Sequence, residues 1–126
     1  MRVARIVALS HVQLAMPAGE EAAARRFYGQ VLGLAEIAKP PRLVPRGGAW
    51  FGDGAVQVHL GVEPDFRPAR KAHPAFRVED LDGLAARCEA AGHAPAWDDE
   101  ILGYRHFYVA DPFGNRLEFL EPNGGV

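Results

Sequence analysis

The sequence predicts an α+β fold built from two copies of one strand–helix–three-strand module. The two halves open alike, with a histidine at the head of a strand (His11 and His73), and each continues with an amphipathic helix and a series of turns. The last strand of each half again carries a metal-capable side chain, His59 or Glu118, at a nearly equal distance from the opening histidine. This repetition indicates a duplicated unit with a site at its pseudo-symmetry axis.

Composition limits what the chain can be. Its 126 residues have room for a single domain, residues 1–126, with one core that the two modules must share. A hydrophobic share of 48% and a charged share of 24% are ordinary for a soluble globular protein, and they exclude disorder, collagen and coiled coil. A net charge of −2 gives no reason to expect nucleic acid or an anionic membrane as a partner.

Signals for targeting and redox chemistry are weak. The longest apolar run near the start, residues 6–9, is too short for a signal sequence or a membrane span, so we expect a cytoplasmic protein. Cys88 is the only cysteine, which excludes an intrachain disulfide and a thiolate metal cluster. Its place in the apolar stripe of a predicted helix favours a role as core filler over one as a reactive thiol.

The first module is predicted to span residues 1–62. Apolar residues alternate with polar or small ones over 11–16, which is the period of a half-buried strand. Two glutamates and then apolar residues at helical spacing predict a helix over 20–32, ended by Gly33. The remaining elements are a short strand over 34–38, a loop rich in proline and glycine over 39–48 and a hairpin over 50–62.

The second module is predicted over residues 73–122. A linker over 63–72, with two prolines and no apolar period, separates it from the first. A strand runs from His73 to Val78, and a helix follows from Leu81 with Asp80 as its N-cap. The remaining elements are a turn and short strand over 95–100, a strand over 104–110, a turn over 111–115 and a last strand over 116–120.

Alternation within each strand sorts apolar from polar side chains. In the strand over 56–60, for example, His59 must point away from the face that carries Val58 and Leu60. The same rule puts polar side chains of four strands on one face, and these are His11, Gln13, Gln57, His59, His73, Arg77, Arg116 and Glu118. In a sheet that curls, these side chains converge on a concave polar pocket.

Four of these side chains have the chemistry of metal ligands. Histidine and carboxylate without thiolate suit Fe(II), Mn, Ni or Zn, and two histidines with one carboxylate leave coordination positions open for a substrate. A single histidine on a strand is more often a surface residue than a ligand, but four ligand-type residues in symmetric places favour a metal site. His93 is interpreted as a surface residue after the second helix, and His106 has no assigned role.

Four motifs, spread over nearly the whole chain, carry a family resemblance: HVQL at 11–14, FYGQVLGL at 27–34, HPAFRV at 73–78 and DPFGNRLEF at 111–119. Together they resemble the vicinal oxygen chelate superfamily, which holds glyoxalase I, extradiol dioxygenases, fosfomycin-resistance enzymes and bleomycin-resistance proteins. The resemblance implies a glyoxalase-like fold. In it, two βαβββ modules form a cupped mixed sheet around a divalent metal, with the helices on the convex side.

The resemblance also implies a set of metal ligands. In the superfamily the ion is commonly held by the first strand of each module and the last strand of the second, which here gives His11, His73 and Glu118. His59 occupies the fourth, symmetric place, where glyoxalase I commonly has a glutamate. We interpret His59 as a fourth ligand or as a base beside the metal, and with Glu118 as a candidate catalytic residue.

These residues lead to a functional hypothesis. We expect an enzyme with one divalent ion per site (Zn, Ni, Mn or Fe(II)) that acts as a Lewis acid on a small oxygen-chelating substrate. The reaction stays open among lyase or isomerase, transferase and dioxygenase chemistry. Expected substrate-binding residues are Gln13, Arg42, Arg46, Trp50 and Gln57.

Two further questions stay open. The alternative function is a metal-free small-molecule or drug-binding protein of the bleomycin-resistance type. We expect a homodimer because single-chain relatives usually dimerise. The sequence does not decide whether each site lies within one chain or between two.

Overall fold

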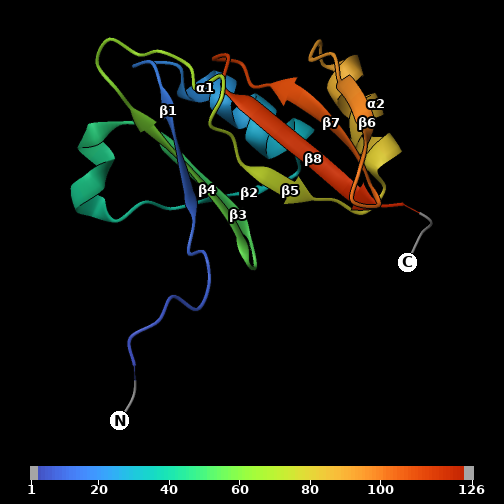
Figure 1. Ribbon diagram of the computed structural model, residues 1–126. Coiled ribbons are helices and arrows are strands. Elements are labelled where there is room, and N and C mark those ends of the chain that lie inside the picture. The colour runs from blue at the N-terminus through green and yellow to red at the C-terminus, as the bar shows by residue number, and fades with distance from the viewer. Residues whose placement is uncertain (1–2, 124–126) are drawn as a thin grey trace.

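The computed structural model describes residues 3–123 (Figure 1). Its elements are, in chain order, β1 (Val12–Met16), α1 (Glu21–Ala24), η1 (Arg25–Val31), β2 (Ala35–Ile37), η2 (Pro41–Arg46), β3 (Ala49–Asp53), β4 (Val56–Val62), β5 (Ala75–Arg77), α2 (Leu81–Ala90), β6 (Ala96–Ile101), β7 (Tyr104–Ala110) and β8 (Arg116–Pro122). The predicted α+β class and the strand–helix–three-strand order of both halves are therefore confirmed.

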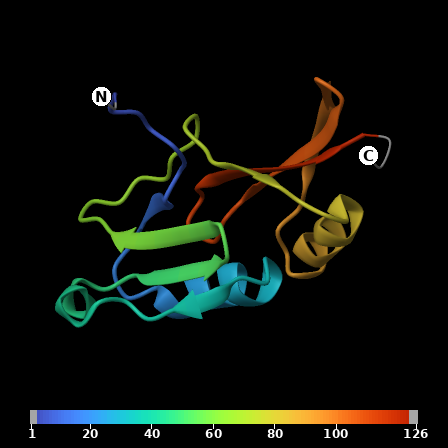
Figure 2. The same ribbon diagram turned by 90° about the horizontal axis from the view of Figure 1, so that it is seen from below.

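The eight strands form two separate four-stranded sheets within the chain, and not one continuous sheet (Figures 1 and 2). The first has the order β1-β4-β3-β2 and the second the equivalent order β5-β8-β7-β6. In each sheet the opening strand runs parallel to the last strand of its module, and the other pairs are antiparallel. β1 and β5 are thus edge strands, and no strand among residues 3–123 pairs with their outer edges.

The burial of alternate strand residues follows the prediction. Leu14 and Met16 in β1 and Leu117 and Phe119 in β8 are buried, because each lies on the face that meets the helices. Glu118, between the last two, lies on the opposite face and is half-buried. Strand alternation therefore separates the core from the face that carries the candidate ligands.

Helix geometry departs from the prediction in the first module. The helix expected over 20–32 is α-helical only in α1, and η1 is a π-helix in which the amide of Leu32 donates to the carbonyl of Phe27 at 2.9 Å. Its predicted buried stripe still forms, with Ala24, Phe27 and Tyr28 in the core. In the second module, α2 begins at the predicted N-cap, since the Asp80 carboxylate accepts a bond from the Gly83 amide at 3.1 Å.

Two of the resemblance motifs meet in the core and join the modules. The Tyr28 hydroxyl donates to Asp111 Oδ2 at 2.6 Å, and the backbone amide of Asn115 donates to Asp111 Oδ1 at 2.8 Å. The Asn115 side chain reaches the first sheet by donating to the carbonyl of Ala15 at 2.9 Å. We call Tyr28, Asp111 and Asn115 the module junction. All three are buried, and burial, followed by the nearby Asp111, raises the pKa of Tyr28 well above its ordinary value.

Two segments that lie outside the sheets are the loop over 39–48 and residues 3–10. The loop expected over 39–48 contains a 3-10 helix, η2, with a proline in its first turn, where a fixed φ and a missing N–H are tolerated. Residues 3–10, the N-terminal arm, form no regular element and extend away from both sheets (Figure 1).

No helix of the described part of the chain is both long and apolar enough to cross a membrane.

Candidate functional site

His73 and Glu118 form the best-defined part of the site. Glu118 lies in β8, opposite Ala75 of β5, and His73 stands just before β5, so the parallel pairing of these strands brings the two side chains together. His73 Nε2 lies 2.9 Å from Glu118 Oε1, with the histidine side chain 24% exposed and the carboxylate 15%. The pair is therefore accessible from the polar face of the second sheet.

The other ring nitrogen of His73 is held by the backbone. His73 Nδ1 lies 3.0 Å from the carbonyl oxygen of Lys71, which can only accept, so Nδ1 carries the proton. Nε2 and Glu118 Oε1 then meet through one shared proton. Metal-binding histidines usually have this arrangement, with the second nitrogen donating to a backbone carbonyl, so the donor set fits a divalent ion.

His11 and His59 form a second pair on the first sheet. Their rings are stacked with centroids 4.1 Å apart, and Trp50 covers the other face of His59 at 3.8 Å, with an interplanar angle of 3°. His59 is 5% exposed, whereas His11 is exposed. Burial first, and then the neighbouring His11, lowers the pKa of His59, so this ring is neutral near pH 7.

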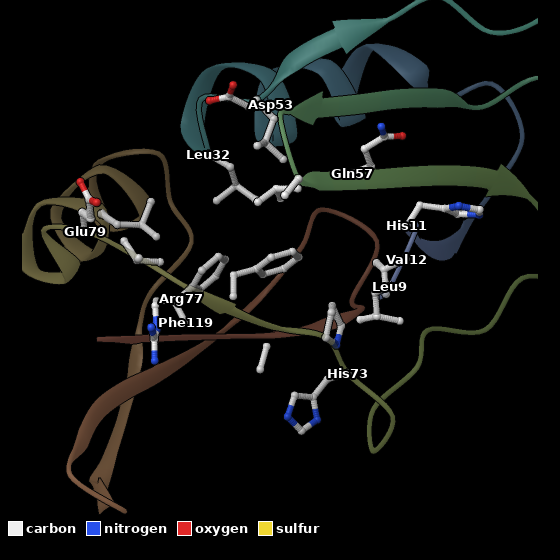
Figure 3. A pocket seen from close by; sticks show the side chains of 18 of the residues that line it. Leu9, His11, Val12, Leu32, Asp53, Gln57, His73, Arg77, Glu79 and Phe119 are labelled. Carbon is white, nitrogen blue, oxygen red and sulfur yellow. The ribbon is translucent and has the colours of Figure 1, made fainter. Parts of the chain in front are cut away.

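A cleft of about 890 Å³ separates the two sheets. His11 and His73 both line it, and Figure 3 shows His11 beside the first sheet and His73 beside the second. Within residues 3–123 of a single chain, however, no three histidine, cysteine, aspartate or glutamate side chains are placed to hold one ion together. Of the ligand set expected to converge, one chain brings together His73 with Glu118 and His11 with His59, as two pairs.

The expected substrate-binding residues are divided in the same way. Gln57 lines the cleft, with its Oε1 3.3 Å from His59 Nε2, and Gln13 is exposed on β1 opposite His59. Arg42 and Arg46 lie exposed on η2 and do not line the cleft. Trp50, Gln13 and Gln57 thus surround His59, while the two arginines stand apart from this group.

Sequence reasoning missed His106. It is 1% exposed on β7, and its Nδ1 lies 2.8 Å from Glu118 Oε2. Strand alternation could have found it, because His106 shares a face with Tyr108, which pairs with Glu118 across the β7–β8 ladder. His93, expected on the surface, is half-buried with its ring 4.7 Å from that of Phe27, since the end of α2 returns toward the first helix.

The fold and this site define a two-module α+β protein with a histidine–glutamate pair on the polar face of one sheet. The glyoxalase/bleomycin resistance protein/dioxygenase superfamily matches residues 8–119. The chain belongs to this superfamily.

Solved structures agree with this assignment. A glyoxalase family protein from Bacillus anthracis is 45% identical to the chain, with a TM-score of 0.91 over 98% of this chain and 100% of its own. The fosfomycin resistance protein FosX from Listeria monocytogenes is 17% identical, with a TM-score of 0.74 over 95% and 97% of the two chains. TnmS3, an antibiotic binding protein from Streptomyces, is 22% identical, with a TM-score of 0.71 over 94% and 100%. The last two share the fold alone. No curated protein sequence matches the chain significantly.

Proposed function

We propose that the chain is a divalent-metal-dependent enzyme that acts on a small substrate with neighbouring oxygen atoms. The His73–Glu118 pair carries this proposal. The Lys71 carbonyl fixes the tautomer of His73, so its Nε2 can exchange the proton shared with Glu118 for a Zn, Ni, Mn or Fe(II) ion. A bound ion would supply Lewis-acid stabilisation of an oxyanion or enolate on the substrate.

His11 is the third proposed ligand, and we infer that it comes from a second copy of the chain. In a symmetric homodimer, His11 of each copy can face the His73–Glu118 pair of the other, which gives two equal sites. Two features support this. The edge strands β1 and β5, next to these residues, leave their outer edges open to another chain. The N-terminal arm leads directly into His11.

The N-terminal arm itself supports an assembly. Its large apolar side chains are almost fully exposed, between 79% and 96%, and these are Val3, Ile6, Val7 and Leu9. A contiguous apolar segment of this kind is a feature of association surfaces rather than of a free surface. Covering the N-terminal arm with a second copy would also fix the position of His11.

His59 has a different environment from the other proposed ligands. Its ring is enclosed between Trp50 and His11, which favours a role in orienting the His11 ring. Because its lowered pKa keeps it neutral, it can also accept a proton from a substrate or serve as a fourth ligand. Glu118 is the other proposed catalytic group. Gln13, Trp50 and Gln57 would contact the substrate beside them, and Arg42 and Arg46 remain proposed contacts for an anionic part of it.

The second candidate is a metal-free small-molecule binder of the drug-sequestering kind. The volume of the cleft, about 890 Å³, lies within the range of ligand pockets, and many of its lining residues are apolar. In that case His11 and His73, which line the cleft, would contact the ligand directly.

Metal analysis separates the two candidates. Protein purified without added metal or chelator should contain a divalent ion, and Zn²⁺ titrated against a chromophoric chelator should bind at about one ion per chain. His73→Ala should weaken Zn²⁺ binding by more than about 100-fold, beyond the loss expected for a residue that only supports a ligand. His93→Ala is the matched control, because that histidine contacts Phe27 and the Ala110 carbonyl. A wild-type chain without measurable Zn²⁺, Ni²⁺ or Mn²⁺ affinity would favour the binder.

His59→Ala assigns the role of His59. Loss of Zn²⁺ affinity as large as that of His73→Ala would make it a ligand. Retained metal with lost turnover would make it a base or a substrate contact.

A further inference from the structure

His106 is buried and polar, and it lies outside the proposed ligand set. Both of its ring nitrogens face oxygen atoms: Nδ1 lies 2.8 Å from Glu118 Oε2, and Nε2 lies 2.8 Å from the carbonyl oxygen of Asp99. Because the carbonyl can only accept, Nε2 carries a proton and donates it. Nδ1 and Glu118 are then joined through one shared proton. The ring is thereby fixed between the backbone of β6 and the carboxylate of Glu118.

The two oxygens of Glu118 consequently have different partners. Oε1 faces His73 Nε2 at 2.9 Å, and Oε2 faces His106 Nδ1 at 2.8 Å. His73 is 24% exposed at its side chain, whereas His106 is 1% exposed. The carboxylate therefore has an inner oxygen held in the core and an outer oxygen directed toward the site.

An irregularity in the sheet supplies the carbonyl that holds His106. β6 and β7 pair regularly up to Asp98 opposite His106, and the register then shifts before Ile101 pairs with Tyr104. At such a β-bulge the extra residue leaves the ladder, which frees its backbone groups for other partners. Asp99 lies in this interval, and its carbonyl accepts from His106.

Tyr108 packs against both histidines that contact Glu118. Its ring centroid lies 5.5 Å from that of His73 and 5.5 Å from that of His106, both in edge-on arrangements. The guanidinium of Arg116 covers the Tyr108 ring at 4.1 Å from its centroid. The orientation of Glu118 is thus set by packing as well as by hydrogen bonds.

We propose that His106 is a positioning residue that holds Glu118 Oε2 and so reserves Oε1 for the metal ion. The inference rests on the proposed function for its metal, and on the hydrogen bonds of the chain itself for its mechanism. Residues that orient a metal ligand typically contribute 10- to 100-fold to metal affinity. The β-bulge of β6, His106 and Glu118 would then form one connected unit.

Two amide substitutions separate the two hydrogen bonds of His106. The asparagine amide nitrogen occupies about the place of Nδ1, so His106→Asn keeps a donor for Glu118. The glutamine amide nitrogen reaches about the place of Nε2, so His106→Gln keeps the bond to Asp99 and loses the one to Glu118. Both variants leave a polar side chain in the core, which makes them a matched pair.

The test measures Zn²⁺ affinity by chelator competition together with urea unfolding of the metal-free proteins. We expect His106→Gln to bind Zn²⁺ about 10- to 100-fold more weakly than wild type, and His106→Asn to lose much less affinity. This order should hold whichever of the two variants is the more stable. Equal Zn²⁺ affinities in the two variants, or a larger loss in His106→Asn than in His106→Gln, would overturn the proposal. The control variant His93→Gln should bind Zn²⁺ as tightly as wild type.

A second readout does not depend on metal. Crystal structures of the two metal-free variants should show the Glu118 carboxylate in place in His106→Asn and reoriented in His106→Gln. If the wild-type chain bound no divalent ion, the proposed function would fail, while these structures would still decide whether His106 positions Glu118. An unmoved carboxylate in His106→Gln contradicts the inference.

Discussion

The module junction and the candidate ligand set are both built from polar side chains of two distant modules, but they differ in completeness. In the junction, Tyr28, Asp111 and Asn115 are buried and fully engaged with one another within one chain. The ligand set is split, with His11 on the first sheet and His73 with Glu118 on the second. Two motifs that are specific to the fold therefore join the modules within one chain, whereas the metal site, as we propose it, needs a second copy of the chain.

The largest effect is expected at the junction. Asp111→Ala removes a carboxylate that accepts from Tyr28, from Asn115 and from the Phe113 amide, and leaves these buried donors without a partner. We expect urea unfolding to show a loss of about 3–5 kcal/mol. Asp82→Asn, at the exposed ion pair with Arg105, should leave the midpoint nearly unchanged.

Glu118→Ala sharpens the contrast. It should abolish Zn²⁺ binding and lower the stability of the metal-free protein less than Asp111→Ala does, because it leaves only one fully buried group, His106 Nδ1, without a partner. Equal losses of stability for the two alanine variants would remove the distinction between a structural junction and a functional set.

A smaller effect is expected in the N-terminal arm. Ile6 is 96% exposed in the single chain, so a charge there should harm only a protein that buries it in an assembly. Ile6→Asp should raise the dissociation constant of the homodimer by at least about tenfold. Light scattering should then show a mass shifting from twice 13.7 kDa toward 13.7 kDa.

The matched control for the N-terminal arm is Leu102→Asp. Leu102 is 92% exposed in the turn between β6 and β7, so its replacement should leave the mass unchanged. A wild-type mass of 13.7 kDa at micromolar concentration would contradict the proposed homodimer.

Much of the fold could be predicted because its signals are local. The alternation of Leu14 and Met16 with polar residues determines which face is buried, and the position of Asp80 before an apolar helical run determines where α2 begins. The π-helical turn of η1 could not be predicted, because apolar spacing over two turns does not distinguish an α-helix from a π-helix.

The site could be predicted only in part. Alternation correctly placed His73 and Glu118 on one face, where parallel pairing of β5 with β8 brings them together. It gives no information on how the first sheet lies relative to the second, and so it could not reveal that His11 stands apart. The contact of His106 with Glu118 follows from the regular β7–β8 ladder and could have been predicted, whereas its bond to the Asp99 carbonyl depends on the β-bulge in β6, which the sequence does not indicate.

The smallest effect concerns the pH dependence of the junction. Burial, and then Asp111, raises the pKa of Tyr28 well above 10.0, so the folded chain keeps this proton where an unfolded tyrosine releases it. The stabilisation is fully present below pH 10 and is lost as pH rises further. Above pH 10, the unfolding free energy of wild type should therefore fall more steeply than that of Tyr28→Phe, by about 1.4 kcal/mol per pH unit. Equal slopes in urea unfolding would show that Tyr28 ionises in the folded chain.

Mixing two inactive variants tests most directly whether the metal site is shared between copies. His11→Ala and Glu118→Ala should each fail to bind Zn²⁺. After unfolding and refolding together, a mixed dimer would pair the intact His11 of one copy with the intact His73 and Glu118 of the other. Equal mixing should then restore about one Zn²⁺ per four chains, because half of the dimers are mixed and each has one intact site. Zn²⁺ binding that stays absent in the mixture, while the mixed dimers are shown to form, would contradict the shared site and place all three ligands within one chain.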